Sequence, residues 1–404
     1  MTTPATILAT TTIAIWLYLF FFRGQFWRLS SFDDDQTKIP GPENLPRVQA
    51  IVPARNEAET ISATVAALLN QNYPGEFSIT VVDDHSTDHT AEIATRTATG
   101  GTANPGCVPV PSFTIHCAST LPAGWTGKLW ALNEAVTKTL ENKNPESLPD
   151  YFWFTDADIT HRPDTLQRLI ARAEKNNLDL TSLMVLLKST TLPEKFLIPP
   201  FLYFFLQLYP PSWMADAKSR SAGAAGGCLL IRTSALKKIG GLASIRDAMI
   251  DDCALAAAVK NSGGQLWMGV TRHSLSLRNY KSFAEIRDLI ARTAFTQLRY
   301  SATLLTLTLA ALLVIYIAPV AFLFAPSWQI RALSAIPLAL MLTSFLPTIR
   351  YYRQTPAWTL ALPAAALFYA YATLLSALRY WTGHGGQWKG RVQAPTTLPT
   401  RPPS

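Results

Sequence analysis

Four long apolar segments, one near the N-terminus and three near the C-terminus, constrain the fold of this chain more than any other feature. Residues 4–22 carry no charged side chain and are followed at once by Arg23 and Arg28. Their length matches the roughly 20 residues with which a helix spans a bilayer. A cleaved signal peptide is the alternative, but no basic segment precedes the run and no small-residue cleavage site follows it. We therefore expect an N-terminal transmembrane anchor over residues 1–29.

The three C-terminal segments run from Ser301 to Ala325, from Ala332 to Ile349 and from about Ala357 to Leu378. Each is long and apolar enough to span a membrane or to lie deep within it, so we expect membrane helices over residues 301–378. Residues 379–404 form a basic, proline-rich tail.

Basic residues beside these segments predict which side of the membrane the rest occupies. Arg23 and Arg28 precede residues 30–300, and Arg287, Arg292 and Arg299 lie at the end of this region. The positive-inside rule therefore places it in the cytoplasm. Three later spans would put the C-terminus outside, whereas Arg379, Lys389 and Arg391 favour a cytoplasmic tail, so the number of spans stays open.

The net charge of +8 points to a lipid surface rather than to nucleic acid. The basic residues do not gather into one dense run with aromatic residues between them, which is the pattern expected of a nucleic-acid-binding chain. A surface facing anionic lipid is the simpler interpretation. The four cysteines, Cys107, Cys117, Cys228 and Cys253, have no metal-site spacing and are expected to be free thiols.

The region 30–300 alternates short apolar runs with helix-like stretches, which is typical of βαβ units and a largely parallel sheet. Ligands of such sheets bind beyond the carboxyl ends of the strands. Seven polar residues follow predicted strands and are expected to converge on one crevice: Arg55, Asn56, Glu57, Asp83, Asp84, Asp156 and Asp158.

Two carboxylate pairs suggest what this crevice binds. Asp83 and Asp84 can accept hydrogen bonds from ribose hydroxyls and a nucleobase edge, whereas helix capping by this segment would not explain both. Asp156 and Asp158, in "FTDAD", can both reach one hard divalent cation, Mg²⁺ or Mn²⁺, that also holds substrate phosphates. An Asp-x-Asp alone is common in turns, so the inference depends on both pairs together.

Six segments in this order resemble membrane-bound family 2 glycosyltransferases: "IVPARNEAETI", "VVDDHSTDHT", "GWTGKLWALNEA", "FTDAD", "MIDDCALA" and "FTQLRY". The nearest resemblance is to the hopanoid-biosynthesis-associated (hopene-associated) group. It implies a GT-A fold, which is α/β and Rossmann-like with a mostly parallel sheet. It also implies a multi-pass protein of the bacterial inner (cytoplasmic) membrane that moves one sugar from a nucleotide-sugar donor, a UDP-sugar, to a lipid acceptor with inversion. A hopanoid and a polyprenyl phosphate are the two candidate acceptors.

The resemblance also implies a role for individual residues. Donor and nucleotide contacts fall on Pro53, Arg55, Glu57, Asp83, Asp84, Lys128, Asp156 and Arg299, with Asp84 favoured for the uracil and ribose. Asp156 and Asp158 are the implied metal ligands, Asp252 the general base with Asp251 as the second candidate, and Tyr300 an acceptor contact. Helix capping is the alternative role of Asp251 and Asp252.

Three positions depart from the family pattern. His85 stands where glycine is common, Ala254 replaces a second acidic residue, and "TQLRY" differs from the Gln-x-x-Arg-Trp signature of processive members at Thr296 and Tyr300. The altered signature favours transfer of a single sugar over polymerisation.

An aromatic segment, residues 195–213, is expected to be broken by Pro199, Pro200, Pro210 and Pro211, to lie in the membrane interface and to admit an amphiphilic acceptor. A buried core helix is the alternative. Two other functions stay open: a haloacid-dehalogenase-type phosphatase with "DADIT" as its nucleophile motif, and a non-enzymatic scaffold. A dinucleotide oxidoreductase is disfavoured because no Gly-x-Gly-x-x-Gly follows the first strand.

Overall fold

The computed structural model describes residues 4–36, 45–100, 111–142, 144–383, 387–388 and 391–392. Cys107, Lys389 and most of the predicted tail lie outside these residues. The chain forms two compact units. The helical unit contains residues 1–32, 188–213 and 279–386, and the α/β unit contains residues 33–187, 214–278 and 387–404.

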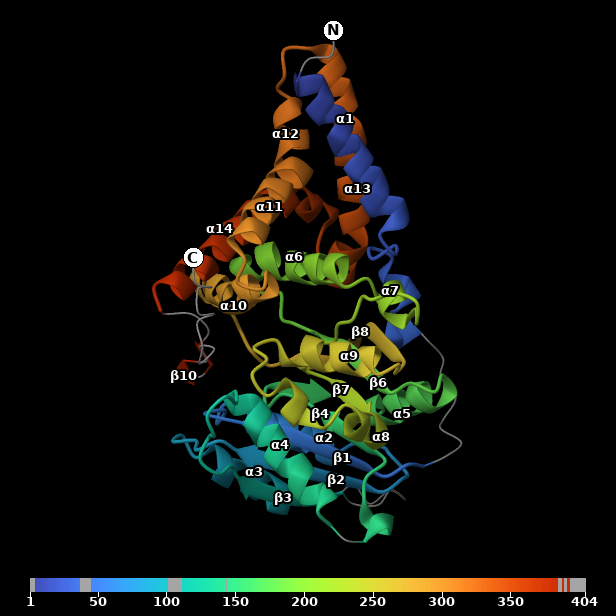
Figure 1. The fold of residues 1–404 in the computed structure, drawn as a ribbon, viewed down its shortest axis with the longest axis vertical. Helices are drawn as coiled ribbons and strands as arrows, with labels where there is room; N and C mark the ends of the chain where they lie inside the picture. Colours follow the sequence, from blue (N-terminus) through green and yellow to red (C-terminus); the bar gives the residue numbers. More distant parts are fainter. Residues whose placement is uncertain are drawn as a thin grey trace, which may run out of the picture. The chain divides into compact units, whose positions relative to one another are not determined.

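The α/β unit is built on an eight-stranded sheet (Figure 1). Its strands lie in the order β3 (Ser112–Cys117), β2 (Phe77–Asp83), β1 (Val48–Ala54), β4 (Tyr151–Phe154), β7 (Leu229–Arg232), β6 (Leu180–Leu186), β8 (Leu266–Ser276) and β5 (Ile159–His161). Neighbours from β3 to β4 are parallel, as are β6 and β8, whereas β7 is antiparallel to both neighbours and β5 to β8. The sheet is therefore mixed. The sequence does not reveal the direction of a strand, because an apolar run that is buried on both faces looks the same in either direction.

Successive side chains of each strand enter two different cores, which explains the continuous apolar runs. On β4, Tyr151 and Trp153 pack into one core, and Phe152 and Phe154 into the other. Residues of α2 (Ile61–Leu69), α3 (Thr90–Gly100) and α5 (Thr165–Lys175) belong to the first core, and those of α4 (Gly127–Leu140), α8 (Thr233–Lys238) and α9 (Asp251–Asn261) to the second. Helices thus cover both faces, and alternation along each strand divides the apolar side chains between them.

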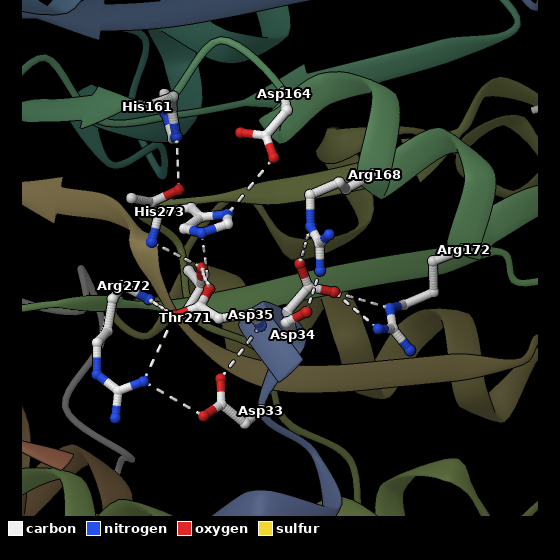
Figure 2. A network of polar contacts seen from close by, with 11 residues as sticks. Asp33, Asp34, Asp35, His161, Asp164, Arg168, Arg172, Thr271, Arg272 and His273 are labelled. Carbon is white, nitrogen blue, oxygen red and sulfur yellow. Dashed lines mark hydrogen bonds and ion pairs between the residues drawn. The ribbon is translucent and has the colours of Figure 1, made fainter. Parts of the chain in front are cut away.

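Three consecutive aspartates, here called the aspartate clamp, fasten residues 33–35 to α5 and β8 (Figure 2). The Asp34 carboxylate is buried and accepts from Arg172 Nη2 at 2.7 Å and from Arg168 Nε at 2.9 Å. Asp35 accepts from the Thr271 hydroxyl at 2.7 Å and from the Arg272 backbone N–H at 2.8 Å. The clamp therefore holds β8 in place from outside the sheet.

Among the described residues of the helical unit, four helices are long and apolar enough to cross a membrane. They are Pro4–Phe22, Ala302–Phe322, Trp328–Tyr351 and Pro356–Trp381, and they coincide with the four predicted segments. The first begins with α1 (Pro4–Leu17), the second joins α11 (Ala302–Leu312) to α12 (Ala318–Phe322), the third is α13 and the fourth contains α14 (Leu362–Trp381). Within this unit α1 packs along α13, and α10 (Phe283–Gln297) along α14 (Figure 1).

The proline-rich segment is not broken where the sequence suggested. A single helix, α6 (Leu192–Leu208), runs through Pro199 and Pro200, and only then does the chain turn into α7 (Pro211–Ala215). Pro199 cannot donate to the Lys195 carbonyl. Gln354 Nε2 donates to that carbonyl instead, at 3.3 Å. The predicted break at these two prolines is therefore wrong.

Candidate active site

The loops that follow β1 and β2 are joined by hydrogen bonds. The Asn56 N–H donates to Ser86 Oγ at 3.0 Å, and the Thr87 N–H donates back to Asn56 Oδ1 at 2.9 Å. The Ala58 N–H donates to Asp88 Oδ2 at 3.0 Å. His85 has a φ of 55°, in the left-handed region that favours glycine, so the expectation of glycine here has a backbone cause. The two loops form one rigid rim beside the strand ends.

The two aspartates of this rim have different environments. Asp84 is 2% exposed, and its carboxylate lies 3.4 Å from Arg55 Nη1 and 3.2 Å from His85 Nδ1. Asp83 accepts from the Ser86 N–H through Oδ2, whereas its buried Oδ1 has no hydrogen-bond partner among the described residues. The buried Nε of Arg55 also has no hydrogen-bond partner among the residues that the structure describes. An unpaired buried polar atom is costly, so these two atoms are candidate ligand contacts.

Lys128 lies at the centre of a carboxylate cluster. It belongs to the first turn of α4, and its Nζ lies 2.9 Å from Asp156 Oδ1 and 3.2 Å from Asp251 Oδ2. Burial alone would lower the pKa of Lys128, but the carboxylates of Asp156, Asp251 and Asp252 outweigh burial and raise it well above its ordinary value. Lys128 therefore remains a cation at the centre of the cluster.

Asp252, in the first turn of α9, has its two carboxylate oxygens fixed by backbone N–H groups. Oδ2 accepts from Gly226 at 2.8 Å and Oδ1 from Cys253 at 2.7 Å. Burial, and then the neighbouring Asp251 carboxylate, raise the pKa of Asp252 to about 6, against the opposing effect of Lys128. Only the Cys253 bond belongs to its own helix, so capping does not account for this geometry. A carboxylate with such a pKa is suited to accept a proton near neutral pH.

Asp156 and Asp158 lie in the turn between β4 and β5. Asp158 Oδ2 is 3.4 Å from Arg278 Nε. Burial, and then the Asp156 carboxylate, raise the pKa of Asp158 to about 6, while Arg278 acts in the opposite direction.

Two carboxylates in one turn suit Mg²⁺ or Mn²⁺, which one or two protein carboxylates hold together with substrate phosphates and waters. In the described part of the chain no group of three or more His, Cys, Asp or Glu side chains is placed to hold a metal. Asp156 and Asp158 would thus supply two carboxylate ligands to such a cation.

A buried chain of hydrogen bonds holds Thr155, the first residue of the turn between β4 and β5. The Thr155 hydroxyl donates to the Gly227 carbonyl at 2.9 Å and contacts His161 Nε2 at 2.8 Å. Since its one proton is used, Thr155 must accept from a protonated Nε2, and Nδ1 then accepts from the Ser274 hydroxyl at 2.8 Å. Burial lowers the pKa of His161 to about 3, so the ring is neutral as this chain requires. His161 thus connects Ser274 of β8 to Thr155, which precedes Asp156. Through Thr155 it is also connected to Gly227, which follows Gly226.

A pocket opens beside these groups. Its lining residues are Pro53, Lys128, Leu129, Leu132, Phe154, Thr155, Asp156, Gly226, Leu229, Leu242, Ile245, Asp251, Asp252 and Leu255. The structure thus brings together Pro53, Lys128, Asp156, Asp251 and Asp252, five residues to which the resemblance assigned a role. Of the seven residues expected to share one crevice, only Asp156 lines this pocket. Glu57 and Asp158 meet at Arg278, which the sequence analysis did not single out.

Arg299 and Tyr300 belong to the helical unit, directly after α10. Both have positive φ, 51° and 56°, and the Tyr300 ring stacks on Tyr380 with centroids 4.4 Å apart. The Tyr300 hydroxyl accepts from Thr296 Oγ1 at 3.1 Å. Their expected contacts with donor and acceptor therefore stay predictions.

Comparison with known proteins supports a glycosyltransferase. Residues 49–240 match the family described as Glycosyl transferase family 2. The chain is 26% identical over 255 residues to Probable glycosyltransferase YdaM of Bacillus subtilis (strain 168), covering 61% of this chain. It spans only 54% of that relative's length.

The fold is similar to that of the mannosyltransferase PcManGT from Pyrobaculum calidifontis, solved in complex with GDP-Man and Mn²⁺. The TM-score is 0.55 at 20% identity, and the match covers 91% of this chain and 99% of that one. Residues 49–240 therefore resemble a family 2 glycosyltransferase domain, and the chain has a GT-A-like fold with a mixed sheet.

Proposed function

We propose that the protein transfers one sugar from a nucleotide-diphospho-sugar to a lipid acceptor, with inversion at the anomeric carbon. The observation that carries the proposal is the convergence of Lys128, Asp156, Asp251 and Asp252 around one pocket. A lysine cation among carboxylates, beside a carboxylate with a raised pKa, suits a reaction in which a diphosphate leaves and a hydroxyl loses its proton.

Donor binding is assigned to the rim and to the turn after β4. Asp83 Oδ1 and Arg55 Nε can satisfy their buried hydrogen-bonding capacity on a base and ribose. We favour Asp83 over Asp84 for this contact, because Asp84 is already paired with Arg55 and His85. Asp156 and Asp158 would hold Mg²⁺ or Mn²⁺, which when bound supplies positive charge to the departing diphosphate. Pro53 and Glu57 complete the donor side.

Asp252 is assigned the role of general base. The acceptor oxygen forms a bond to the anomeric carbon while the bond from that carbon to the diphosphate breaks, and the hydroxyl proton passes to the Asp252 carboxylate. Attack from the face opposite the leaving group inverts the anomeric centre. Lys128 stays protonated and stabilises negative charge on the leaving diphosphate, while the Gly226 N–H holds the Asp252 carboxylate in position.

A lipid acceptor is supported by the four long apolar helices in the same chain. We assign residues 1–29 and 301–378 to the membrane, 30–300 to the cytoplasm and 195–213 to the acceptor's route, in a bacterial inner membrane protein. A hydroxyl acceptor, as on a hopanoid, is favoured over a polyprenyl phosphate. An anionic phosphate would meet Asp156, Asp251 and Asp252 and needs no base, so it would leave the raised pKa of Asp252 without a role.

The phosphatase alternative fits the geometry less well. Asp156 would be its nucleophile, yet Asp156 Oδ1 is paired with Lys128 at 2.9 Å, and the matched family spans this segment. Incubation with a phosphate ester should therefore release no phosphate.

Mass spectrometry of lipid extracts tests the proposal. Cells that express the protein should contain a lipid heavier by one sugar than the lipid of cells that lack it. Cells with Asp252→Asn should lack this species at equal protein level. Identical lipid profiles in all three, with sugar transferred instead to a soluble acceptor, would overturn the lipid assignment.

A further inference from the structure

Arg278 lies on the donor side of the site, yet the proposed reaction gives it no role. It follows β8 by two residues, and its guanidinium contacts two acidic side chains of the donor side. Nε lies 3.4 Å from Asp158 Oδ2, and Nη2 lies 3.8 Å from Glu57 Oε1. The Arg278 side chain is 38% exposed, whereas that of Asp158 is 16% exposed, so the cation lies on the solvent side of the carboxylate.

Each of the two candidate metal ligands is thus paired with a cation of the chain itself. Lys128 is paired with Asp156 at 2.9 Å and Arg278 with Asp158 at 3.4 Å. A divalent cation that arrives without a donor must displace Arg278 from Asp158 or share that carboxylate with it. Either event costs Coulomb energy, because two positive charges then lie side by side.

A donor diphosphate changes this balance. A guanidinium binds phosphate oxygens through two parallel N–H groups, and such charge-assisted pairs are among the stronger hydrogen bonds in proteins. Arg278 could leave Asp158 for the diphosphate and so release the carboxylate to the metal at the moment when the diphosphate supplies the other ligands.

The backbone that leads to Arg278 is held in place, whereas its side chain is partly exposed. The Leu277 N–H donates to the Asp158 carbonyl at 2.7 Å, and the aspartate clamp holds Thr271 and Arg272 of the same strand (Figure 2). Glu57 is fixed by its own N–H, which donates to Thr90 Oγ1 at 2.9 Å. Glu57 therefore remains a second anchor for the guanidinium when Asp158 turns to the metal.

We propose that Arg278 is a donor-binding residue that makes metal binding depend on the donor diphosphate. It neutralises Asp158 in the donor-free protein and binds the diphosphate in the loaded one. This inference rests on the proposed function, because it requires a nucleotide-diphospho-sugar and a divalent cation at the same site.

Metal titration of the purified full-length protein tests the inference without measuring turnover. Free Mn²⁺ is followed by electron paramagnetic resonance as MnCl₂ is added, with and without UDP or GDP. The wild type should bind Mn²⁺ weakly alone and more tightly with the nucleotide. Arg278→Ala should bind Mn²⁺ alone on the order of tenfold more tightly, since a competing cation is gone. It should bind the nucleotide on the order of tenfold more weakly, as expected for the loss of one charge-assisted pair.

Two further variants control this experiment. Arg278→Lys keeps the charge but loses the planar fork, so it should keep the weak binding of Mn²⁺ alone and still lose nucleotide affinity. Arg47→Ala removes an arginine paired with Asp150 at 3.7 Å, at the start of β1, and should change neither affinity. A wild type that binds neither UDP nor GDP would overturn the proposed function itself. A wild type that binds nucleotide and Mn²⁺ cooperatively, with Arg278→Ala indistinguishable from it, would overturn only the role of Arg278.

Discussion

Replacing Gly226 by alanine should slow turnover, because the added methyl group would press on the two groups that do the chemistry. A Cβ at this position would lie 3.2 Å from Lys128 Nζ, 3.3 Å from Asp252 Oδ2 and 3.5 Å from Asp252 Cβ. Ordinary contacts of a Cβ begin at about 3.4 Å, so the lysine or the carboxylate must move by a few tenths of an ångström. A misplacement of about 1 Å can cost roughly 100-fold in rate, and we therefore expect kcat to fall roughly threefold to tenfold.

The neighbouring glycine provides a matched control. The three atoms nearest to a Cβ at Gly227 would all be apolar: Val185 Cγ1 and Cγ2 at 3.2 Å and Ile159 Cδ1 at 3.6 Å. Gly227→Ala should therefore destabilise the protein by about 1–3 kcal/mol through overpacking, while kcat stays within about twofold of wild type.

Initial rates at saturating donor and acceptor, together with thermal unfolding, separate the two effects. Gly226→Ala should lower kcat with little change in the KM for the donor, and Gly227→Ala should lower mainly Tm. A normal kcat in Gly226→Ala would refute the placement of Gly226 beside the reacting groups. An equal loss of kcat in both variants would show that loosened packing, rather than contact with Asp252 and Lys128, is responsible.

Three other changes test separate parts of the structure. Asp34→Asn removes the buried negative charge that Arg168 and Arg172 share and should cost about 3–5 kcal/mol of unfolding free energy in a denaturant titration. Asp150→Asn, in a pair whose carboxylate is 48% exposed, should cost less than about 1 kcal/mol, and equal losses would contradict the clamp. Because the pKa of Asp252 is raised to about 6 and a base must be deprotonated, kcat/KM should increase with pH up to about 6 and then level off. Asp252→Asn should lose this increase with pH and should lower turnover roughly 100-fold to 10,000-fold. A normal rate in this variant would place the base elsewhere. Deleting residues 1–22 should leave the protein in the membrane fraction through its later helices, and its recovery as a soluble protein would argue against membrane embedding of residues 301–378.

The features that could be predicted from the sequence depend on local pattern. The length of the apolar runs predicted all four candidate membrane helices, because a helix needs a continuous stretch to span a bilayer. Polar residues directly after apolar strands suggested that Glu57 and Asp158 would lie on one side of the sheet, and both contact Arg278; Lys128 and Asp251, which meet Asp156, were indicated only by the family resemblance.

The features that could not be predicted depend on partners far away in the chain. The helix α6 continues through Pro199 because the Lys195 carbonyl accepts from Gln354, which lies 159 residues further along. The sequence does not show that Asp84 is paired with Arg55, which is the contact that leads us to propose Asp83 instead of Asp84 for the nucleotide. Arg278 follows a strand and resembles any surface arginine in sequence, so only its approach to Asp158 and Glu57 distinguishes it.

Transfer of radiolabelled sugar by the purified full-length protein tests the central claim most directly. The protein is incubated with Mn²⁺, bacterial membrane lipids and a panel of UDP- and GDP-sugars, and label is measured in the organic and aqueous phases. We predict that one donor places label in the organic phase, that chelation of the metal abolishes the transfer, and that Asp158→Ala, a correctly folded variant, does not catalyse it. Donor cleavage with all label left in the aqueous phase, or transfer that persists at the wild-type rate in Asp158→Ala or without a divalent cation, would contradict a metal-dependent transfer of sugar to lipid at this site.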